Sequence, residues 1–230
     1  MINIAKEVIL FFTGKVYFKG ACMENIDSEI QKFYNDIAQQ FADEWYANED
    51  LLPVLKRFID LLNPNPRVLD LGCGAGYESM RLYKLGARVT GVDFSDEPIR
   101  IARERNPQCQ FEVADFRKID QSFGVFDGIV AISSIIHIRD EELDSVFSNM
   151  KKVIRPEGFV MIVVVEGLGI CEERSKIERE GVQYNRPFYL HSKMRLNEVA
   201  VNTGFEHFDD MQLSDELASF GWKCLLYRAK

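Results

Sequence analysis

The 230-residue chain has few of the features that mark secreted, zinc-binding or membrane-spanning proteins. Its five cysteines are odd in number and form no C-x-x-C pair, which argues against a disulfide framework and against a zinc site. No stretch approaches the roughly 18 consecutive apolar residues of a transmembrane helix. The apolar run 8–12 is too short for a signal-peptide core, and no small-residue cleavage site follows it. We therefore expect a cytoplasmic protein with reduced thiols, no metal and no membrane partner.

Basic residues are also too few and too dispersed for a nucleic-acid-binding surface. The chain has 28 Lys and Arg against 36 Asp and Glu, so its net charge at pH 7 is −8. Nucleic-acid-binding domains usually carry a basic stripe. The charge-rich stretch 172–180 instead mixes both signs, which is typical of a solvated helix face. The composition predicts no nucleic-acid partner, and the length suits one domain with a sizeable core.

The most informative feature that is present is a glycine-rich turn after an apolar segment. Gly72, Gly74 and Gly76 follow Asp70 at every second position. Missing side chains in a tight turn let a ligand contact the backbone, and the next helix would point its N-terminus at that ligand. The dinucleotide motif G-x-G-x-x-G places its third glycine one residue later. Asp70 would repel a pyrophosphate and attract a ligand that carries an ammonium and a sulfonium group.

A second acid supports the same kind of ligand. The segment 88–93 reads as a short strand that ends in Asp93. An acid about 20 residues after a glycine turn is placed to accept hydrogen bonds from both hydroxyls of a ribose. The alternative for Asp93 is a simple strand-end acid.

Strand-length and helix-length segments alternate along the chain, which predicts a parallel, doubly wound α/β sheet. Two helices are expected before the first strand, the second capped by Asp50, and a later helix capped by Ser192 ends before Gly204. The first of them has an apolar stripe formed by Ile30, Phe33, Ile37, Phe41 and Trp45. The expected strands are 67–71, 88–93, 109–113, 126–132, 159–165, 205–213 and 222–228, and the helices between them are 77–85, 96–105 and 141–154.

The segments 70–76 and 91–95 resemble the first two motifs of the class I S-adenosylmethionine-dependent methyltransferases. Three later segments resemble further motifs of that family in the same order: 112–116, 126–134 and 155–159. The resemblance covers roughly residues 65 to 230. It implies a Rossmann-like, seven-stranded, mostly parallel sheet with an antiparallel last strand and an N-terminal helical cap. It also implies S-adenosyl-L-methionine as the cofactor and S-adenosyl-L-homocysteine as the product.

The resemblance also implies which residues bind the cofactor. Asp70 and the glycine turn would hold the methionine part, Asp93 the ribose and Asp115 the adenine amino group. The alternative for Asp115 is a turn-forming acid, and Cys73 is interpreted as a small residue rather than a nucleophile. The full cofactor-binding set is Tyr34, Asp70, Leu71, Gly72, Cys73, Gly74, Gly76, Asp93, Phe94, Ser95, Ala114, Asp115, Phe116, Ile132 and Ser133.

His137 is the candidate catalytic base, because its ordinary pKa near 6.5 suits proton abstraction at neutral pH. Pocket lining or a structural hydrogen bond is the alternative role. Tyr34 resembles a cofactor-contacting tyrosine of the family, although it adjoins the apolar stripe. Arg186 either binds a substrate carboxylate or phosphate through its planar fork or forms a surface salt bridge.

The expected organisation is an extension over 1–22, or an upstream mis-assigned start, followed by a methyltransferase domain over 23–230. A hairpin is possible over 8–18. Within the domain, 23–62 would form the helical cap and 166–191 a lid that covers the substrate.

The expected activity is methyl transfer (EC 2.1.1.-) to O, N or C of a small molecule, by a monomer or homodimer. The Asn/Asp-Pro-Pro-aromatic motif of amino-adenine enzymes and a Pro-Cys nucleophile for cytosine are both absent. Two alternatives stay open: a non-catalytic S-adenosylmethionine-binding accessory protein, and transfer of another group from a related cofactor.

Overall fold

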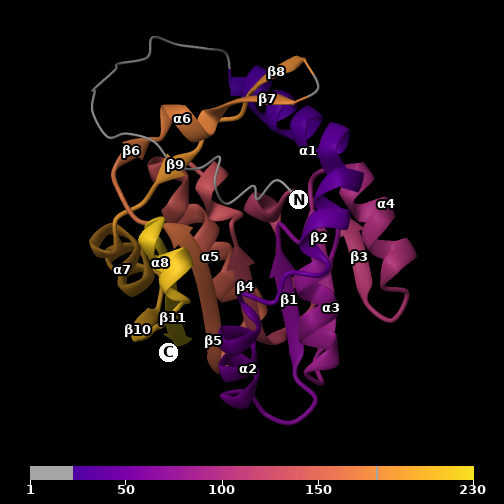
Figure 1. Ribbon diagram of the computed structural model, residues 1–230. Helices are drawn as coiled ribbons and strands as arrows, with labels where there is room; N and C mark the ends of the chain where they lie inside the picture. Colours follow the sequence, from indigo (N-terminus) through magenta and orange to yellow (C-terminus); the bar gives the residue numbers. More distant parts are fainter. Residues whose placement is uncertain (1–22, 180) are drawn as a thin grey trace.

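The computed structural model describes residues 23–179 and 181–230, so the predicted extension over 1–22 and its hairpin lie outside the described residues. The central strands are β1 Arg67–Leu71, β2 Arg88–Asp93, β3 Gln110–Val113, β4 Phe126–Ile132, β5 Ile154–Val165, β10 Phe205–Met211 and β11 Trp222–Ala229. They form one sheet in the order β10-β11-β5-β4-β1-β2-β3 (Figure 1). β11 is antiparallel to both of its neighbours, and the remaining pairs are parallel. The predicted fold class is confirmed.

Helices cover both faces of the sheet, as the strand sequences require. β4 shows why: Ile129 and Ala131 belong to one apolar core and Val130 to the other, because successive side chains of a strand point to opposite faces. The first core packs against α5 Leu143–Val153 and α7 Lys193–Asn202, and the second against α2 Leu52–Asp60 and α3 Tyr77–Lys84. α4 Asp96–Arg105 packs on β2 and β3 and contacts α1 Met23–Trp45.

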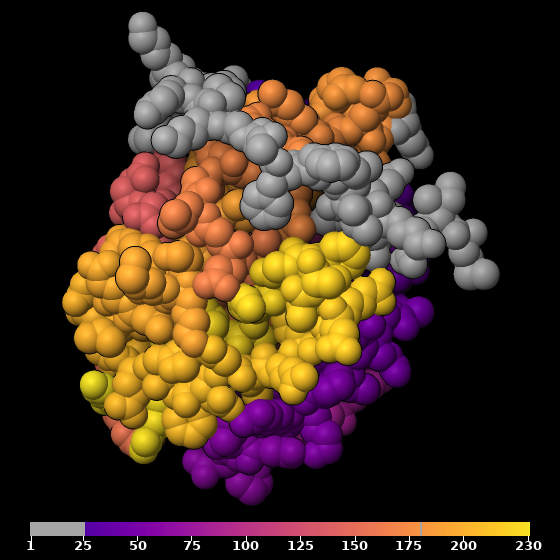
Figure 2. All heavy atoms as spheres, turned by 60° about the vertical axis from the view of Figure 1, so that its left-hand side comes forward, coloured from indigo at the N-terminus to yellow at the C-terminus, as the bar shows by residue number. Residues whose placement is uncertain are grey.

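The C-terminal strands also meet the N-terminal helices. Met211, Leu213 and Leu226 share a core with α2 residues such as Phe58. Figure 2 shows this neighbourhood from outside, with yellow C-terminal residues beside indigo N-terminal ones. α8 Asp215–Ser219 lies between β10 and β11 in the chain.

The segment predicted as a lid is built from short elements rather than one helix. They are β6 Gly169–Ile170, α6 Glu172–Ser175, β7 Lys176–Arg179, β8 Val182–Asn185 and β9 Tyr189–Leu190. The β7–β8 hairpin packs on α1, where the Phe33 and Tyr184 ring centroids are 5.1 Å apart and the Tyr184 hydroxyl donates to Asp36 (2.9 Å). Figure 1 shows the hairpin beside α1 above the sheet.

Three local predictions are wrong. The described part of the stretch predicted as a helix face, 172–179, is helical only over α6, because pairing with β8 makes residues 176–179 a strand. Asp50 does not cap α2. The N-cap residue is Leu51, which has no side-chain cap, and the Asp50 carboxylate accepts from the side-chain amide of Asn48 instead. β5 begins at Ile154 rather than 159, because Ile154 pairs with Phe126 ahead of a register shift in the β4–β5 pairing. The predicted Ser192 cap is confirmed, since its hydroxyl accepts from the Arg195 amide.

Among the described residues, no helix has the length and apolar character needed to cross a membrane.

Candidate functional site

The glycine turn joins β1 to α3 at the carboxyl end of the sheet. Gly72 has φ +70°, and a Cβ on it would lie 2.4 Å from the Ser134 Cβ. A Cβ on Gly76 would come within 3.0 Å of side chains around α4 and β3. A Cβ on Gly74 (φ +51°) meets only the Tyr77 hydroxyl, at 4.0 Å. Gly72 and Gly76 therefore make room for the protein's own packing, and Gly74 leaves open space in front of the turn.

Asp93, at the end of β2, fixes the shape of this turn. One carboxylate oxygen accepts from the Gly74 amide (3.0 Å) and the other from the Ser95 amide (2.9 Å). Burial raises the pKa of Asp93, and these amide hydrogen bonds oppose the rise. Each carboxylate oxygen can accept a further hydrogen bond, so the group keeps capacity for ligand hydroxyls.

Two more acids lie behind the turn. Asp70 is 2% exposed, and it accepts from the Ser79 hydroxyl (2.6 Å). Burial raises its pKa to about 7, and the charges of Glu78 and Asp93 add to the rise. Glu78 pairs with Arg81 through Oε1 (3.1 Å), but its Oε2 is buried with no hydrogen-bond partner among the described residues. Three carboxylates therefore share a buried space without enough positive charge to balance them.

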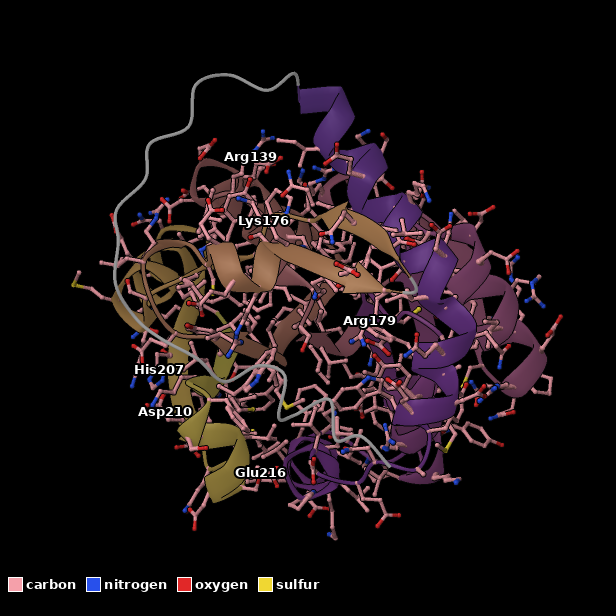
Figure 3. The ribbon with its side chains drawn as sticks, turned by 45° about the horizontal axis from the view of Figure 1, so that its top comes forward. Arg139, Lys176, Arg179, His207, Asp210 and Glu216 are labelled. Carbon is pink, nitrogen blue, oxygen red and sulfur yellow. The ribbon has the colours of Figure 1, made fainter. Side chains whose placement is uncertain are left out.

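These groups open onto a cavity of about 1310 Å³. It lies where the chain leaves β1 and β4 in opposite directions, which is the usual ligand site of an open α/β sheet. α1 and the β7–β8 hairpin cover the cavity, and Lys176 and Arg179 of that hairpin line it (Figure 3). Drug-sized ligands typically occupy about 300–1,000 Å³, so this cavity has room for more than one small molecule.

The N-terminal part of the roof is tied to the glycine turn. The Tyr46 hydroxyl donates to the Ala75 carbonyl (2.7 Å), and Asn106 donates to that same hydroxyl (2.6 Å). The buried Arg81 guanidinium donates to the carbonyls of Trp45 (2.6 Å) and Asn48. The loop after α1 is thereby held against α3, next to the cavity.

The other side of the cavity carries a polar cluster from three distant segments. The Tyr34 hydroxyl of α1 lies 2.7 Å from His137 Nε2, and His137 Nδ1 lies 2.8 Å from the Pro187 carbonyl oxygen. A carbonyl can only accept, so Nδ1 carries the proton and Nε2 accepts from Tyr34. Arg186 Nη1 donates to the Tyr34 hydroxyl (3.2 Å) and to Nε2 (3.3 Å). Burial, together with the Arg186 charge, lowers the pKa of His137 to about 3.

Asp115 also lines the cavity and belongs to an ion-pair network. Its carboxylate accepts from the Arg117 guanidinium at 2.9 and 3.1 Å and from the Arg117 amide at 3.0 Å. Arg117 also pairs with Asp27 (2.8 Å). Burial acts to raise the pKa of Asp115, but the Arg117 hydrogen bonds outweigh it and hold the pKa below its ordinary value. Asp115 is therefore ionised and able to accept.

The chain is similar in sequence and fold to several known methyltransferases. A family model described as a methyltransferase domain matches residues 68–158. Phosphoethanolamine N-methyltransferase 1 of Zea mays is 32% identical over 190 residues, 79% of this chain and 36% of that protein. The ubiquinone biosynthesis O-methyltransferase of Pseudomonas aeruginosa strain UCBPP-PA14 is 28% identical over 62% of this chain and 65% of that one.

Burkholderia thailandensis 1,6-didemethyltoxoflavin-N1-methyltransferase is similar in structure. It was solved with 1,6-didemethyltoxoflavin and S-adenosylhomocysteine bound. Its TM-score is 0.72 at 18% identity, over 94% of this chain and 93% of that one.

The chain belongs to the class I S-adenosylmethionine-dependent methyltransferases. The predicted family is thereby confirmed. The chain spans less than two thirds of the length of these curated relatives, and their names include both N- and O-methyltransferases.

Most of the predicted cofactor-binding residues, together with the candidate base His137, line this cavity. They are Tyr34, Asp70, Gly72, Cys73, Gly74, Asp93, Phe94, Asp115, Phe116, Ile132, Ser133 and His137. Ser133 directly follows β4 and has φ +54°, a conformation that few non-glycine residues adopt. The remaining four do not line the cavity: Leu71, Gly76, Ser95 and Ala114. Leu71 is fully buried in a core, and Gly76 and Ser95 are the N-cap residues of α3 and α4.

Several lining residues went unnoticed in the sequence. Glu78 and Tyr77 follow the glycine turn and have no motif of their own beyond their place at the start of α3. Leu217, Phe220 and other C-terminal residues reach the cavity only through tertiary packing. The local signal among these residues is a carboxylate, Glu78, in the first turn of the helix that follows the glycine turn.

Proposed function

We propose that this chain transfers the methyl group of S-adenosyl-L-methionine to an O, N or C atom of a small molecule and releases S-adenosyl-L-homocysteine. The observation that carries the proposal is the charge arrangement of the cavity. Three buried carboxylates meet at an open glycine turn, and room for a second molecule lies beyond them.

The side chains at the turn fit a cationic cofactor. Gly74 leaves space for a ligand against its backbone, and Glu78 Oε2 is buried without a partner among the described residues. An ammonium group close to Asp70 would supply the positive charge that this group of acids lacks, and would lower the pKa of Asp70 from about 7. We assign the ammonium to Asp70 and Glu78, the ribose hydroxyls to Asp93 and the adenine amino group to Asp115.

The cofactor, when bound, supplies a methyl group already activated on sulfur, with a neutral thioether as leaving group. The protein's task is then mainly to hold the acceptor atom in line behind that methyl group, and positioning of this kind is worth several kcal/mol. The cap over 23–62 and the lid over 166–191 are proposed to enclose the acceptor, since α1 and β7–β8 roof the cavity.

We propose that Tyr34 faces the acceptor and that His137 orients the Tyr34 side chain. The hydrogen bond from Tyr34 to Nε2 and the one from Nδ1 to Pro187 use both ring nitrogens. With a pKa of about 3, His137 is neutral at physiological pH and only weakly basic. This favours hydrogen bonding over the alternative role of a base that titrates near neutral pH.

The acceptor class is supported by the size of the cavity and by relatives whose names include phosphoethanolamine N-methyltransferase. We also propose a cytoplasmic location, in keeping with free thiols at Cys73, Cys109, Cys171 and Cys224, and a monomer or homodimer.

Methyl-tritiated S-adenosylmethionine provides the test. The wild-type protein is incubated with a metabolite extract from which macromolecules have been removed by filtration. We expect label in small molecules together with S-adenosylhomocysteine, and neither product with Asp93→Ala. Cofactor binding without turnover would indicate a non-catalytic binding protein, and binding only of a decarboxylated or carboxylated relative would indicate transfer of another group.

A further inference from the structure

Two arginines of the segment 166–191 face the cavity without an ion-pair partner among the described residues. Arg174 and Arg186 both line it, and both guanidinium carbons lie within 6.0 Å of the Phe188 ring centroid. Arg186 also stacks on Phe33, 4.6 Å from the ring centroid. Their hydrogen bonds go to neutral groups: Arg174 donates to the Phe220 carbonyl (3.1 Å), and Arg186 to Tyr34 and His137.

No carboxylate among residues 23–179 and 181–230 forms an ion pair with either arginine. Glu173 favours the charged form of Arg174, but burial and the nearby Arg186 charge lower the pKa of Arg174 below its ordinary value. The Nε of Arg186 is buried and has no hydrogen-bond partner among the described residues. Two like charges and an unused donor at one place in a cavity are what an anion-binding site provides.

The positions of the charges separate this site from the cofactor's ammonium site. The acids Asp70, Glu78 and Asp93 surround the glycine turn, whereas Arg186 contacts the Tyr34 and His137 side chains. Burial raises the pKa of Tyr34, the Arg186 charge opposes that rise and the Asp93 charge adds to it. The acids at the turn and the two arginines therefore line different parts of the cavity.

We propose that the methyl acceptor carries an anionic group, a carboxylate or a phosphate, and that Arg186, assisted by Arg174, holds it. The inference rests on the proposed function, because it assumes that the cofactor occupies the glycine-turn side. Arg186 offers a planar fork of donors, which suits the paired oxygens of both groups. Anchoring there would place the rest of the acceptor beside Tyr34.

The experiment titrates inorganic phosphate and, separately, acetate into wild-type protein saturated with S-adenosylhomocysteine. Binding is followed by calorimetry and by tryptophan fluorescence, since the Trp222 ring centroid lies 5.9 Å from the Arg174 guanidinium carbon. We expect saturable binding of at least one anion. The anion with the higher affinity indicates whether the acceptor carries a phosphate or a carboxylate. Arg186→Gln should weaken binding about tenfold or more, because it removes charge-assisted hydrogen bonds. Arg186→Lys keeps the charge but not the planar guanidinium, so its anion affinity should lie between those of the wild type and Arg186→Gln.

The control is Arg100→Gln, which removes the same charge from the exposed surface of α4, where Arg100 pairs with Glu97 and Glu104. It should bind anions as the wild type does. Absence of saturable binding, or equal binding by Arg186→Gln, would overturn the proposal. A loss of S-adenosylhomocysteine affinity in Arg186→Gln would also overturn it, by assigning Arg186 to the cofactor's own carboxylate. Failure of the wild type to bind S-adenosylhomocysteine would instead count against the proposed function, and anion titration of the ligand-free protein would still test the arginine site.

Discussion

Replacing Asp70 by Asn should stabilise the ligand-free protein and weaken cofactor binding at the same time. The pKa of Asp70 is raised from 3.8 to about 7, so the folded state binds a proton more tightly than the unfolded state does. The stabilising contribution of this group is therefore complete below about pH 4 and is lost as the pH rises to 7. A rise of about three units corresponds to at most about 4 kcal/mol. Asn stays neutral at every pH and can still accept from Ser79.

Chemical denaturation from pH 4 to 8 and calorimetric titration of S-adenosylmethionine measure the two effects. We expect Asp70→Asn to exceed wild type in the free energy of unfolding by up to a few kcal/mol at pH 8, with the gain vanishing near pH 4. Cofactor affinity at pH 8 should fall about 10- to 100-fold, because one charge-assisted hydrogen bond is worth roughly 1.5–3 kcal/mol. Glu112→Gln, which removes an exposed acid, is the control. A variant less stable than wild type at pH 8, or one with unchanged affinity, would refute the reasoning.

Three further predictions are tested by ligand-binding calorimetry, by chemical denaturation and by steady-state kinetics. Asp93→Asn should lower S-adenosylhomocysteine affinity about tenfold or more without unfolding the protein, and unchanged affinity would remove Asp93 from the ribose site. Gly72→Ala should cost about 2–4 kcal/mol of unfolding free energy, because its Cβ would overlap the Ser134 Cβ and its φ is +70°. Gly74→Ala should cost only about 1 kcal/mol but should weaken cofactor binding, and equal stability losses would contradict the distinction. Tyr34→Phe and His137→Gln should lower kcat while leaving S-adenosylhomocysteine affinity near wild type. If kcat of the wild type rises through a pKa near 6.5 and this dependence disappears in His137→Gln, His137 acts as a general base instead.

Sequence reasoning succeeded where the signal is local. A strand that breaks into glycines, an acid at the end of the next strand and the alternation of strands with helices each depend on neighbouring residues. These signals placed β1 and β2 at their observed bounds, and brought Asp70, Gly74 and Asp93 to one cavity.

The parts that sequence reasoning missed depend on contacts between distant segments. Arg186 and Tyr34 are 152 positions apart, so nothing local indicates that their side chains meet under the lid. Residues 176–179 form a strand because they pair with β8. Gly72 and Gly76 look alike in the sequence, yet their neighbours Ser134 and α4 give them packing roles that only the tertiary structure reveals.

The most direct measurement is a crystal structure of the protein with S-adenosylhomocysteine bound. We predict the ribose hydroxyls within hydrogen-bond distance of Asp93, the ammonium beside Asp70 and Glu78, and the sulfur open toward Tyr34. S-adenosylhomocysteine bound elsewhere, or bound with its ribose away from Asp93, would contradict the assignment of this cavity as the methyl-donor site.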